Sequence, residues 1–324
     1  MPRKARLEFP GAIYHILNRG NYRSPIFASD GAKRSFEQTL FEACQRYHWI
    51  LHAHAIMKNH YHAAIETLDA NLSVGMQWLQ ATFANRFNKL RKANGHLFQG
   101  RYKSLIVERD EYFGSLLHYI HLNPVRVKLS EASNLNQFRW SSMYYMDKKK
   151  NRPDCLDIGT CLRYAGNLSD TRAGWRSYLQ YLEWLACSKQ DQKEQHFDKM
   201  CKGWALGAKA FKKEVLISNA QDVEKWQGPE SQEARELYWE NLLDQLLKGM
   251  NKTKSDIASD NKSARWKVMI AYYLKTHTAV TNGWLSVKLN MGAVQGVSRY
   301  VSTFAKQKLY DKREYKKAPL NITT

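Results

Sequence analysis

Hydrophobic positions in the first 130 residues follow two different periods, and each change of period marks the end of an element. Alternation at every second residue predicts strands, and apolar positions three and four residues apart predict helices. Strands are expected at 12–18, 49–57, 60–67 and 99–107. Helices are expected at 30–46, with Ser29 as its cap, at 72–92, and from 110 to Pro124. This order of strands and helices predicts an α+β fold, a ferredoxin-like antiparallel sheet with helices packed against it.

Helical patterns dominate the remainder of the chain and predict an α-helical C-terminal part. Helices are expected at 175–189, 233–247 and 264–274, and the stretch 188–229 is polar with little periodicity apart from 197–216. A charged run at 148–153 ends in proline and marks a boundary near residue 150. We therefore expect a mixed domain at 1–150, a helical linker region at 151–235 and a helical domain at 236–324.

The last of these parts contains a pattern typical of a helix-turn-helix. A short helix from residue 281, a turn at 290–292 and a second helix at 294–304 follow one another. An ordinary helical hairpin gives the same pattern, and the basic character of the chain favours contact with DNA. The residues of the second helix that we expect to face a DNA groove are Gln295, Ser298, Arg299 and Ser302.

Two histidines flank one tyrosine at His60, Tyr61 and His62. Side chains in a strand alternate between the two faces, so both imidazoles are expected on one face and Tyr61 on the other. Imidazoles placed in this way can share a divalent metal ion. The pair by itself is weak evidence, because a lone His-x-His is common in proteins without a metal.

The predicted helix that begins at 110 adds two residues that complement the histidines. Tyr119 and Asn123 are four residues apart and therefore lie on the same helix face, with Pro124 expected to end the helix. A tyrosine hydroxyl can act as a nucleophile, and an amide oxygen can serve as a third, hard metal ligand. Tyr112 lies two turns earlier on nearly the same face and is the competing nucleophile.

Composition indicates a partner rich in phosphate. The chain has 50 Lys and Arg against 30 Asp and Glu, a net charge of +20 and a pI near 9.7. Such a protein attracts nucleic acid electrostatically, and its 10 Trp and 18 Tyr can offer stacking surfaces for unpaired bases. No apolar stretch is long enough to span a membrane, and no signal peptide is expected. The five cysteines are odd in number and form no Cys-x-x-Cys pair, which indicates reduced thiols in a cytoplasmic protein.

Six segments in the first 130 residues together resemble one known family. The chain is similar to the REP-associated tyrosine transposases, which belong to the single-tyrosine HUH (His-hydrophobe-His) nucleases. The family usually has proline where Lys58 stands, so the turn before His60 is expected to be less rigid. The segments that carry the resemblance are MPRKAR at 1–6, FPGA at 9–12, NRG at 18–20, MKNHYH at 57–62, GHLFQGRYKS at 95–104 and YIHLNPVR at 119–126.

The resemblance implies a specific chemistry. His60, His62 and Asn123 would hold Mg²⁺ or Mn²⁺, and Tyr119 would attack a phosphodiester of single-stranded DNA beside a hairpin. The product is a 5′-phosphotyrosine link, which keeps the phosphodiester energy for rejoining. Cationic residues near the site, expected as phosphate contacts, are Arg101, Lys103 and Arg126.

Two other functions remain open from the sequence. The first alternative is a non-catalytic DNA-binding regulator, in which the tyrosine site is unused and the C-terminal helix pair binds duplex DNA. That helix pair resembles the duplex-reading end of bacterial replication initiators. The second alternative is an RNA-binding protein. The sequence makes no prediction of the oligomeric state.

Overall fold

The computed structural model describes residues 6–226 and 229–309, except for the side chains at 224, 225, 229 and 230. The described residues divide into two compact units. One unit is Glu8–Ala208, and the other comprises Arg6, Leu7 and the chain from Lys209 onward. Of the predicted motif at 1–6, only Arg6 lies among the described residues. No helix in the described part of the chain is long and apolar enough to cross a membrane.

A single sheet forms the centre of the first unit. Its order is β2-β3-β1-β4-β5, with antiparallel pairing throughout except for β5, which runs parallel to β4. The first four strands have the ferredoxin-like order, so the predicted α+β class is confirmed. The fifth strand comes from beyond residue 200 and was not predicted. The strands are β1 (Ala12–Arg19), β2 (Trp49–Ile56), β3 (His60–Thr67), β4 (Lys103–Val107) and β5 (Ala205–Leu206).

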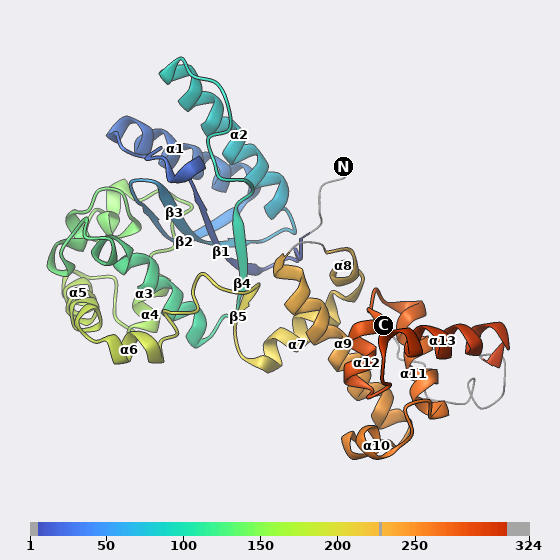
Figure 1. The fold of residues 1–324 in the computed structure, drawn as a ribbon. Helices are drawn as coiled ribbons and strands as arrows, with labels where there is room; N and C mark the ends of the chain where they lie inside the picture. Colours follow the sequence, from blue (N-terminus) through green and yellow to red (C-terminus); the bar gives the residue numbers. More distant parts are fainter. Residues whose placement is uncertain (1–5, 227–228, 310–324) are drawn as a thin grey trace. The chain divides into compact units, whose positions relative to one another are not determined.

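Helices cover both faces of this sheet (Figure 1). On one face, Tyr61 packs against Phe36 of α1 and near Phe83 of α2, as strand alternation requires. On the opposite face lies α3, whose residues Leu116 and Ile120 are fully buried. The helices of this unit are α1 (Asp30–Tyr47), α2 (Leu72–Arg91), α3 (Glu111–Arg126), α4 (Gly159–Tyr164), α5 (Arg172–Cys187) and α6 (Lys189–Glu194). Short 3₁₀ segments join them: η1 (Asn21–Arg23), η2 (Ala132–Gln137), η3 (Ser142–Tyr145) and η4 (Lys149–Asn151).

Local sequence signals account for most of these boundaries. The hydroxyl oxygen of Ser29 accepts a hydrogen bond from the Ala32 N–H, which caps the start of α1 as expected. The fourth strand begins at Lys103, later than predicted, because Gly100 has a φ of +67° and interrupts the extended chain. Before Gly100, Phe98 forms a separate bridge with Gly20, the residue that follows the end of β1.

The helix that carries Tyr119 also differs from the prediction. It was expected to end at Pro124, but α3 continues through Pro124 to Arg126. Proline removes only one helical hydrogen bond, the one its own N–H would donate. The next turn is held by the Val127 N–H, which donates to the Asn123 carbonyl at 3.1 Å. The proline is therefore accommodated in the last turn.

Residues 151–208 pack within the first unit, where the sequence predicted a linker region starting at 151. Tyr178 of α5 is fully buried, and its hydroxyl oxygen lies 3.0 Å from Nδ1 of His118 and 2.7 Å from Nδ1 of His121. Trp204 is also fully buried beside the sheet edge. These aromatic contacts make the segment part of the body that contains Tyr119.

The second unit is helical in its described part. The turn between α12 and α13 has positive φ at Asn290 and Gly292, as expected for the residues predicted to form it. Val297 and Val301 of α13 are buried, and Phe304 packs on Tyr272 of α11. The helices are α7 (Lys209–Ser218), α8 (Ala220–Lys225), α9 (Pro229–Gly249), α10 (Lys254–Ser259), α11 (Arg265–His277), α12 (Asn282–Lys288) and α13 (Val294–Lys306).

Candidate active site

The two histidines of the HYH motif lie on the same face of β3. Their ring centroids are 5.3 Å apart, with His62 buried and His60 half-buried. The turn that precedes them is closed by a 2.8 Å hydrogen bond from the Met57 N–H to the His60 carbonyl. The strand therefore presents both rings together even though Lys58 stands where the family usually has proline.

Tyr119 approaches this pair from α3. Its ring meets the His62 ring edge-on, with centroids 5.7 Å apart. Asn123 follows one turn later and is buried, and its side-chain nitrogen has no hydrogen-bond acceptor of good geometry among the described residues. A buried amide without such an acceptor fits a residue whose partner is a bound group. The structure thus brings Tyr119 and His62 into contact and places Asn123 beside them.

A third histidine, His15 of β1, joins the site and was missed from the sequence. It stacks on His62 with ring centroids 5.1 Å apart, and its Nε2 lies 2.9 Å from Nδ1 of His62. Its other nitrogen, Nδ1, lies 2.8 Å from the carbonyl oxygen of Met200. The signal was present, because Leu17 pairs with His62 and residue 15 is then the diagonal neighbour on the same face. Predicting the contact between His15 and His62 requires the pairing register of β1 and β3.

The nucleophile candidate is covered in this structure. The hydroxyl oxygen of Tyr119 lies 3.2 Å from the sulfur of Cys201, and the ring of Phe197 packs edge-on against the Tyr119 ring at 5.4 Å. Tyr119 is consequently only 7% exposed. Within the described residues, the candidate metal-binding cluster of His, Cys, Asp or Glu side chains is His15, His62 and Cys201, whose ligand atoms lie within 4.8 Å of one another. No local sequence signal pointed to Cys201, because it meets Tyr119 from 82 positions further along the chain.

Burial controls the protonation of the site. It lowers the pKa of His15 to about 4, and it lowers the pKa of His60 to about 4 with help from the nearby Arg19. Burial and three neighbouring cationic or imidazole groups hold the pKa of His62 well below its ordinary value. Burial, together with the Cys201 thiol, raises the pKa of Tyr119. At neutral pH the imidazoles are therefore uncharged and the phenol keeps its proton.

The cationic residues predicted as phosphate contacts divide into two groups. Arg126 stands over the Tyr119 ring, with its guanidinium carbon 5.0 Å from the ring centroid. Lys103 donates a hydrogen bond of 2.9 Å to the Cys201 carbonyl, so it also borders the site. Arg101 is exposed. Arg19, which pairs with His60 across the sheet, is a further cation at this edge.

The remaining histidines near the motif are structural. His52 lies 3.1 Å from a Glu66 oxygen and 3.4 Å from an Asp157 oxygen. His54 lies 3.3 Å from a buried carboxylate oxygen of Glu37, and Arg139 pairs with the same carboxylate. His118 and His121 turn away from the Tyr119 face toward Tyr178, as a regular helix requires. Each of these four rings has a carboxylate or hydroxyl neighbour, while Nδ1 of His52 and Nδ1 of His54 have no hydrogen-bond partner of good geometry among the described residues.

Tyr112, the competing nucleophile, has a different environment from Tyr119. Its ring stacks on His196 with centroids 4.8 Å apart. No described contact joins it to His60 or His62. The geometry therefore favours Tyr119 as the nucleophile.

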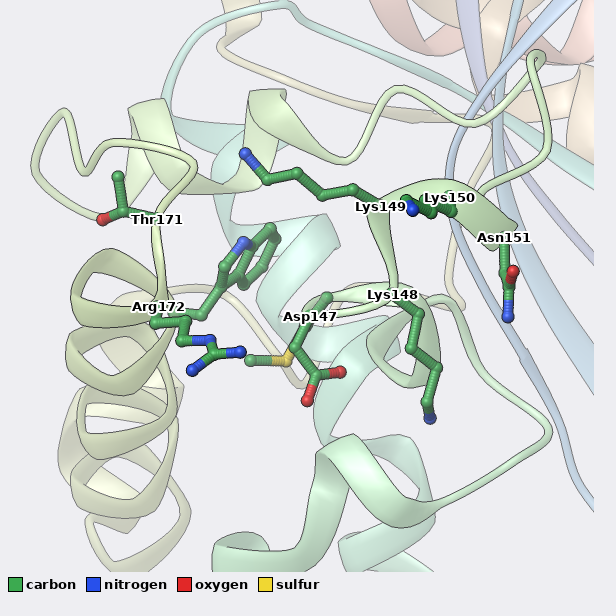
Figure 2. A pocket seen from close by; sticks show the side chains of 9 residues that line it. Asp147, Lys148, Lys149, Lys150, Asn151, Thr171 and Arg172 are labelled. Atoms are coloured by element: carbon green, nitrogen blue, oxygen red, sulfur yellow. The ribbon is translucent and has the colours of Figure 1, made fainter.

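A basic pocket lies elsewhere in the same unit (Figure 2). It has a volume of about 520 Å³ and shares no lining residue with the histidine–tyrosine cluster. Lys149 is paired with Asp170 at 3.1 Å, and the ammonium of Lys148 stands 3.1 Å from the centre of the Tyr144 ring. These contacts engage two of its four cations. The lining is Met146, Asp147, Lys148, Lys149, Lys150, Asn151, Thr171, Arg172 and Trp175.

In the second unit, α13 presents the side chains that the sequence placed in a groove-facing position. Gln295, Ser298, Arg299 and Ser302 are all exposed, while Val297 and Val301 face inward. The face is available for contact, and the structure contains no partner on it.

Comparison with known proteins agrees with the site. Residues 9–123, from the start of the sheet to Asn123, match the model of the family described as IS200-like transposases. This segment, about a third of the chain, is similar to the IS200-like transposases. The match agrees with the family resemblance seen in the sequence, and the matched segment includes Tyr119, His60 and His62.

A solved structure, that of a REP-associated tyrosine transposase bound to a REP hairpin, aligns with this chain at a TM-score of 0.39 and 13% sequence identity. The alignment covers 47% of this chain and 89% of that one. A search of curated proteins gives no match.

Proposed function

We propose that this chain is a metal-dependent, single-stranded DNA transposase that cleaves and rejoins DNA beside hairpins through a 5′-phosphotyrosine. The observation that carries the proposal is the contact between Tyr119 and His62, with His60 on the same strand face, inside the segment that matches the IS200-like transposases. A phenol beside two clustered imidazoles is the arrangement that a tyrosine nucleophile with a metal site requires.

The residues fit a divalent cation. His60, His62 and Asn123 would hold it, because the two imidazoles are uncharged at neutral pH and the buried Asn123 offers an amide oxygen one helical turn from Tyr119. When bound, Mg²⁺ or Mn²⁺ supplies Lewis-acid polarisation of a non-bridging oxygen of the scissile phosphate. A donor set of two imidazoles and one amide is softer than Mg²⁺ prefers, so Mn²⁺ is expected to bind well.

Tyr119 performs the bond exchange in this proposal. Its Oη forms a bond to phosphorus and loses its proton, while the bond from phosphorus to the 3′-oxygen breaks and that oxygen takes up a proton. The downstream strand stays attached to Tyr119 through its 5′-phosphate, and the upstream strand ends in a free 3′-hydroxyl. Arg126 and Lys103 are positioned to offset the phosphate charge near the ring.

Cleavage requires a local change at Tyr119. The Cys201 thiol is within hydrogen-bond distance of the Tyr119 hydroxyl, and the Phe197 ring packs against the Tyr119 ring. A DNA phosphate can reach the hydroxyl only after these two side chains turn aside. The raised pKa of Tyr119 has burial as its main cause, so opening the site also makes the phenol easier to deprotonate.

For the second unit we propose a contact with duplex DNA through α13. Gln295, Ser298 and Arg299 form an exposed polar face on a helix that follows a short helix and a turn. This unit would add affinity, while the first unit performs the chemistry.

Cleavage of end-labelled DNA tests the proposal. The full chain is mixed with Mn²⁺ and a pool of single-stranded hairpin oligonucleotides with randomised flanks, and the products are separated under denaturing conditions. A 3′-label should move into a protein–DNA adduct, while a 5′-label should leave on a shorter free strand. Binding without any adduct would support a non-catalytic regulator, and a preference for ribo- over deoxyribo-hairpins would support RNA binding.

A further inference from the structure

His15 is positioned to determine which nitrogen of His62 is free to bind a metal. It is fully buried in β1, and both of its ring nitrogens are within hydrogen-bond distance of a partner. A carbonyl oxygen can only accept a hydrogen bond, so Nδ1 of His15 must carry the proton that it donates to Met200.

The proton position on His15 also determines the proton position on His62. A neutral imidazole has one N–H, so Nε2 of His15 is then an acceptor. The atom that faces it at 2.9 Å is Nδ1 of His62, which must therefore be the donor. In a neutral His62 this leaves Nε2 without a proton, with its lone pair available.

The Met200 carbonyl, which accepts the hydrogen bond from His15, belongs to a segment that is held against the sheet. The Met200 side chain is fully buried, and the next carbonyl, that of Cys201, accepts the Lys103 ammonium at 2.9 Å. Four residues after Met200, the Trp204 carbonyl accepts a hydrogen bond of 3.0 Å from the Ile106 N–H, where β5 joins the sheet. Both bonds hold the backbone that follows Met200 against β4.

We propose that His15 is a positioning residue that holds His62 in its Nδ1–H tautomer, so that Nε2 is the metal-binding atom. A free imidazole in water favours the opposite tautomer, and a wrong tautomer at a metal ligand must be exchanged before the ion binds. The inference rests on the proposed function in one respect, that His62 is a metal ligand. The tautomer itself is a property of this chain without metal.

Two amide substitutions separate the roles of the two His15 nitrogens. His15→Gln places an amide oxygen near the position of Nε2 and can still accept the His62 proton. His15→Asn places its amide near the position of Nδ1, so it keeps a Met200 contact and loses the link to His62. The two variants are matched in polarity and differ in which bond they keep.

The first measurement is the dissociation constant of Mn²⁺ for the metal-free full chain, determined by electron paramagnetic resonance of the free ion. His15→Asn should weaken binding by about 10- to 100-fold, and His15→Gln by no more than about threefold. Equal Mn²⁺ affinity in wild type and His15→Asn would overturn the role of His15. No Mn²⁺ binding by wild type, or undiminished binding by His62→Ala, would instead overturn the proposed metal site.

The second measurement reads the tautomer in the wild-type protein itself. Nitrogen-15 NMR of histidine-labelled wild-type protein without metal distinguishes protonated from bare ring nitrogens. We expect His62 to show a protonated Nδ1 and a bare Nε2, with the signals assigned by their loss in His62→Ala. A protonated Nε2 on His62 would refute the relay directly, while leaving the proposed function to be decided by the cleavage assay.

Discussion

The hydroxyl of Tyr119 and the thiol of Cys201 are within hydrogen-bond distance, with 3.2 Å between oxygen and sulfur. The proposed nucleophile is therefore engaged by a residue of the same chain before any DNA arrives. Cys201 lies 82 positions later in the sequence, and it reaches Tyr119 because the following residues form the edge strand β5.

Removal of the thiol should make cleavage faster. A typical hydrogen bond contributes about 0.5–1.5 kcal/mol, so freeing the Tyr119 hydroxyl in Cys201→Ala should raise the rate of adduct formation by about 2- to 10-fold. The measurement is the single-turnover rate of adduct formation with Mn²⁺. Cys187→Ala, at an exposed cysteine, is the matched control and should be unchanged. A large loss of rate in Cys201→Ala would show that the thiol assists the reaction.

Metal-dependent cleavage should depend on both histidines of β3. Replacing His60 and His62 by alanine removes two of the three expected ligands, so cleavage should fall to background at every Mn²⁺ concentration. Circular dichroism establishes that the variant folds. His48→Ala, at an exposed histidine, is the control. Cleavage by the double variant at the wild-type rate would refute the metal assignment.

Buried neutral histidines should make the protein sensitive to mild acid. Burial lowers the pKa of His118 to about 3, from an ordinary value of 6.5. Between pH 6.5 and 3 the unfolded chain binds this proton and the folded chain does not, so the free energy of unfolding falls as the pH falls. The contribution of one such group approaches about 1.4 kcal/mol per pH unit and vanishes above pH 6.5.

Urea unfolding of wild type and His118→Asn between pH 7 and 4 measures this effect. The amide retains a partner for the Tyr178 hydroxyl but does not titrate. The variant should therefore lose stability less steeply than wild type as the pH falls. Equal slopes for the two proteins would show that His118 does not take part in the pH dependence.

The exposed face of α13 should bind duplex DNA. Arg299→Ala removes one cation from this face. If Arg299 contacts only phosphate, affinity should fall evenly for all sequences and the salt dependence should become shallower by about one unit; if it reads a base, discrimination should relax at one position. Electrophoretic mobility at two salt concentrations separates these results. Lys254→Ala, at an exposed cation of α10, is the control, and unchanged affinity of Arg299→Ala for every DNA tested would remove α13 from the interface.

The sequence predicted the elements whose signals are local. Strand alternation placed His60 and His62 on one face, helical spacing placed Tyr119 beside Asn123, and Ser29 was expected as the cap of α1. Each of these depends on residues no more than four positions apart. The α+β class followed from the order of the elements.

The missed features depend on contacts between distant segments. His15 meets His62 only because β1 and β3 pair in a particular register, and Cys201 meets Tyr119 only because residues 205 and 206 join the sheet. The sequence predicts that the helix ends at Pro124. A proline in the last turn removes a single helical hydrogen bond, and tertiary packing keeps the helix intact to Arg126. Periodicity contains no information about such long-range pairing.

The most direct test of the account asks whether Tyr119 becomes covalently joined to DNA. Wild type, Tyr119→Phe and Tyr112→Phe are each incubated with Mn²⁺ and 3′-labelled single-stranded hairpin DNA, then separated under denaturing conditions. The account predicts a labelled adduct with wild type and Tyr112→Phe, and none with Tyr119→Phe although that variant still binds the hairpin. An adduct that persists in Tyr119→Phe and disappears in Tyr112→Phe would contradict it.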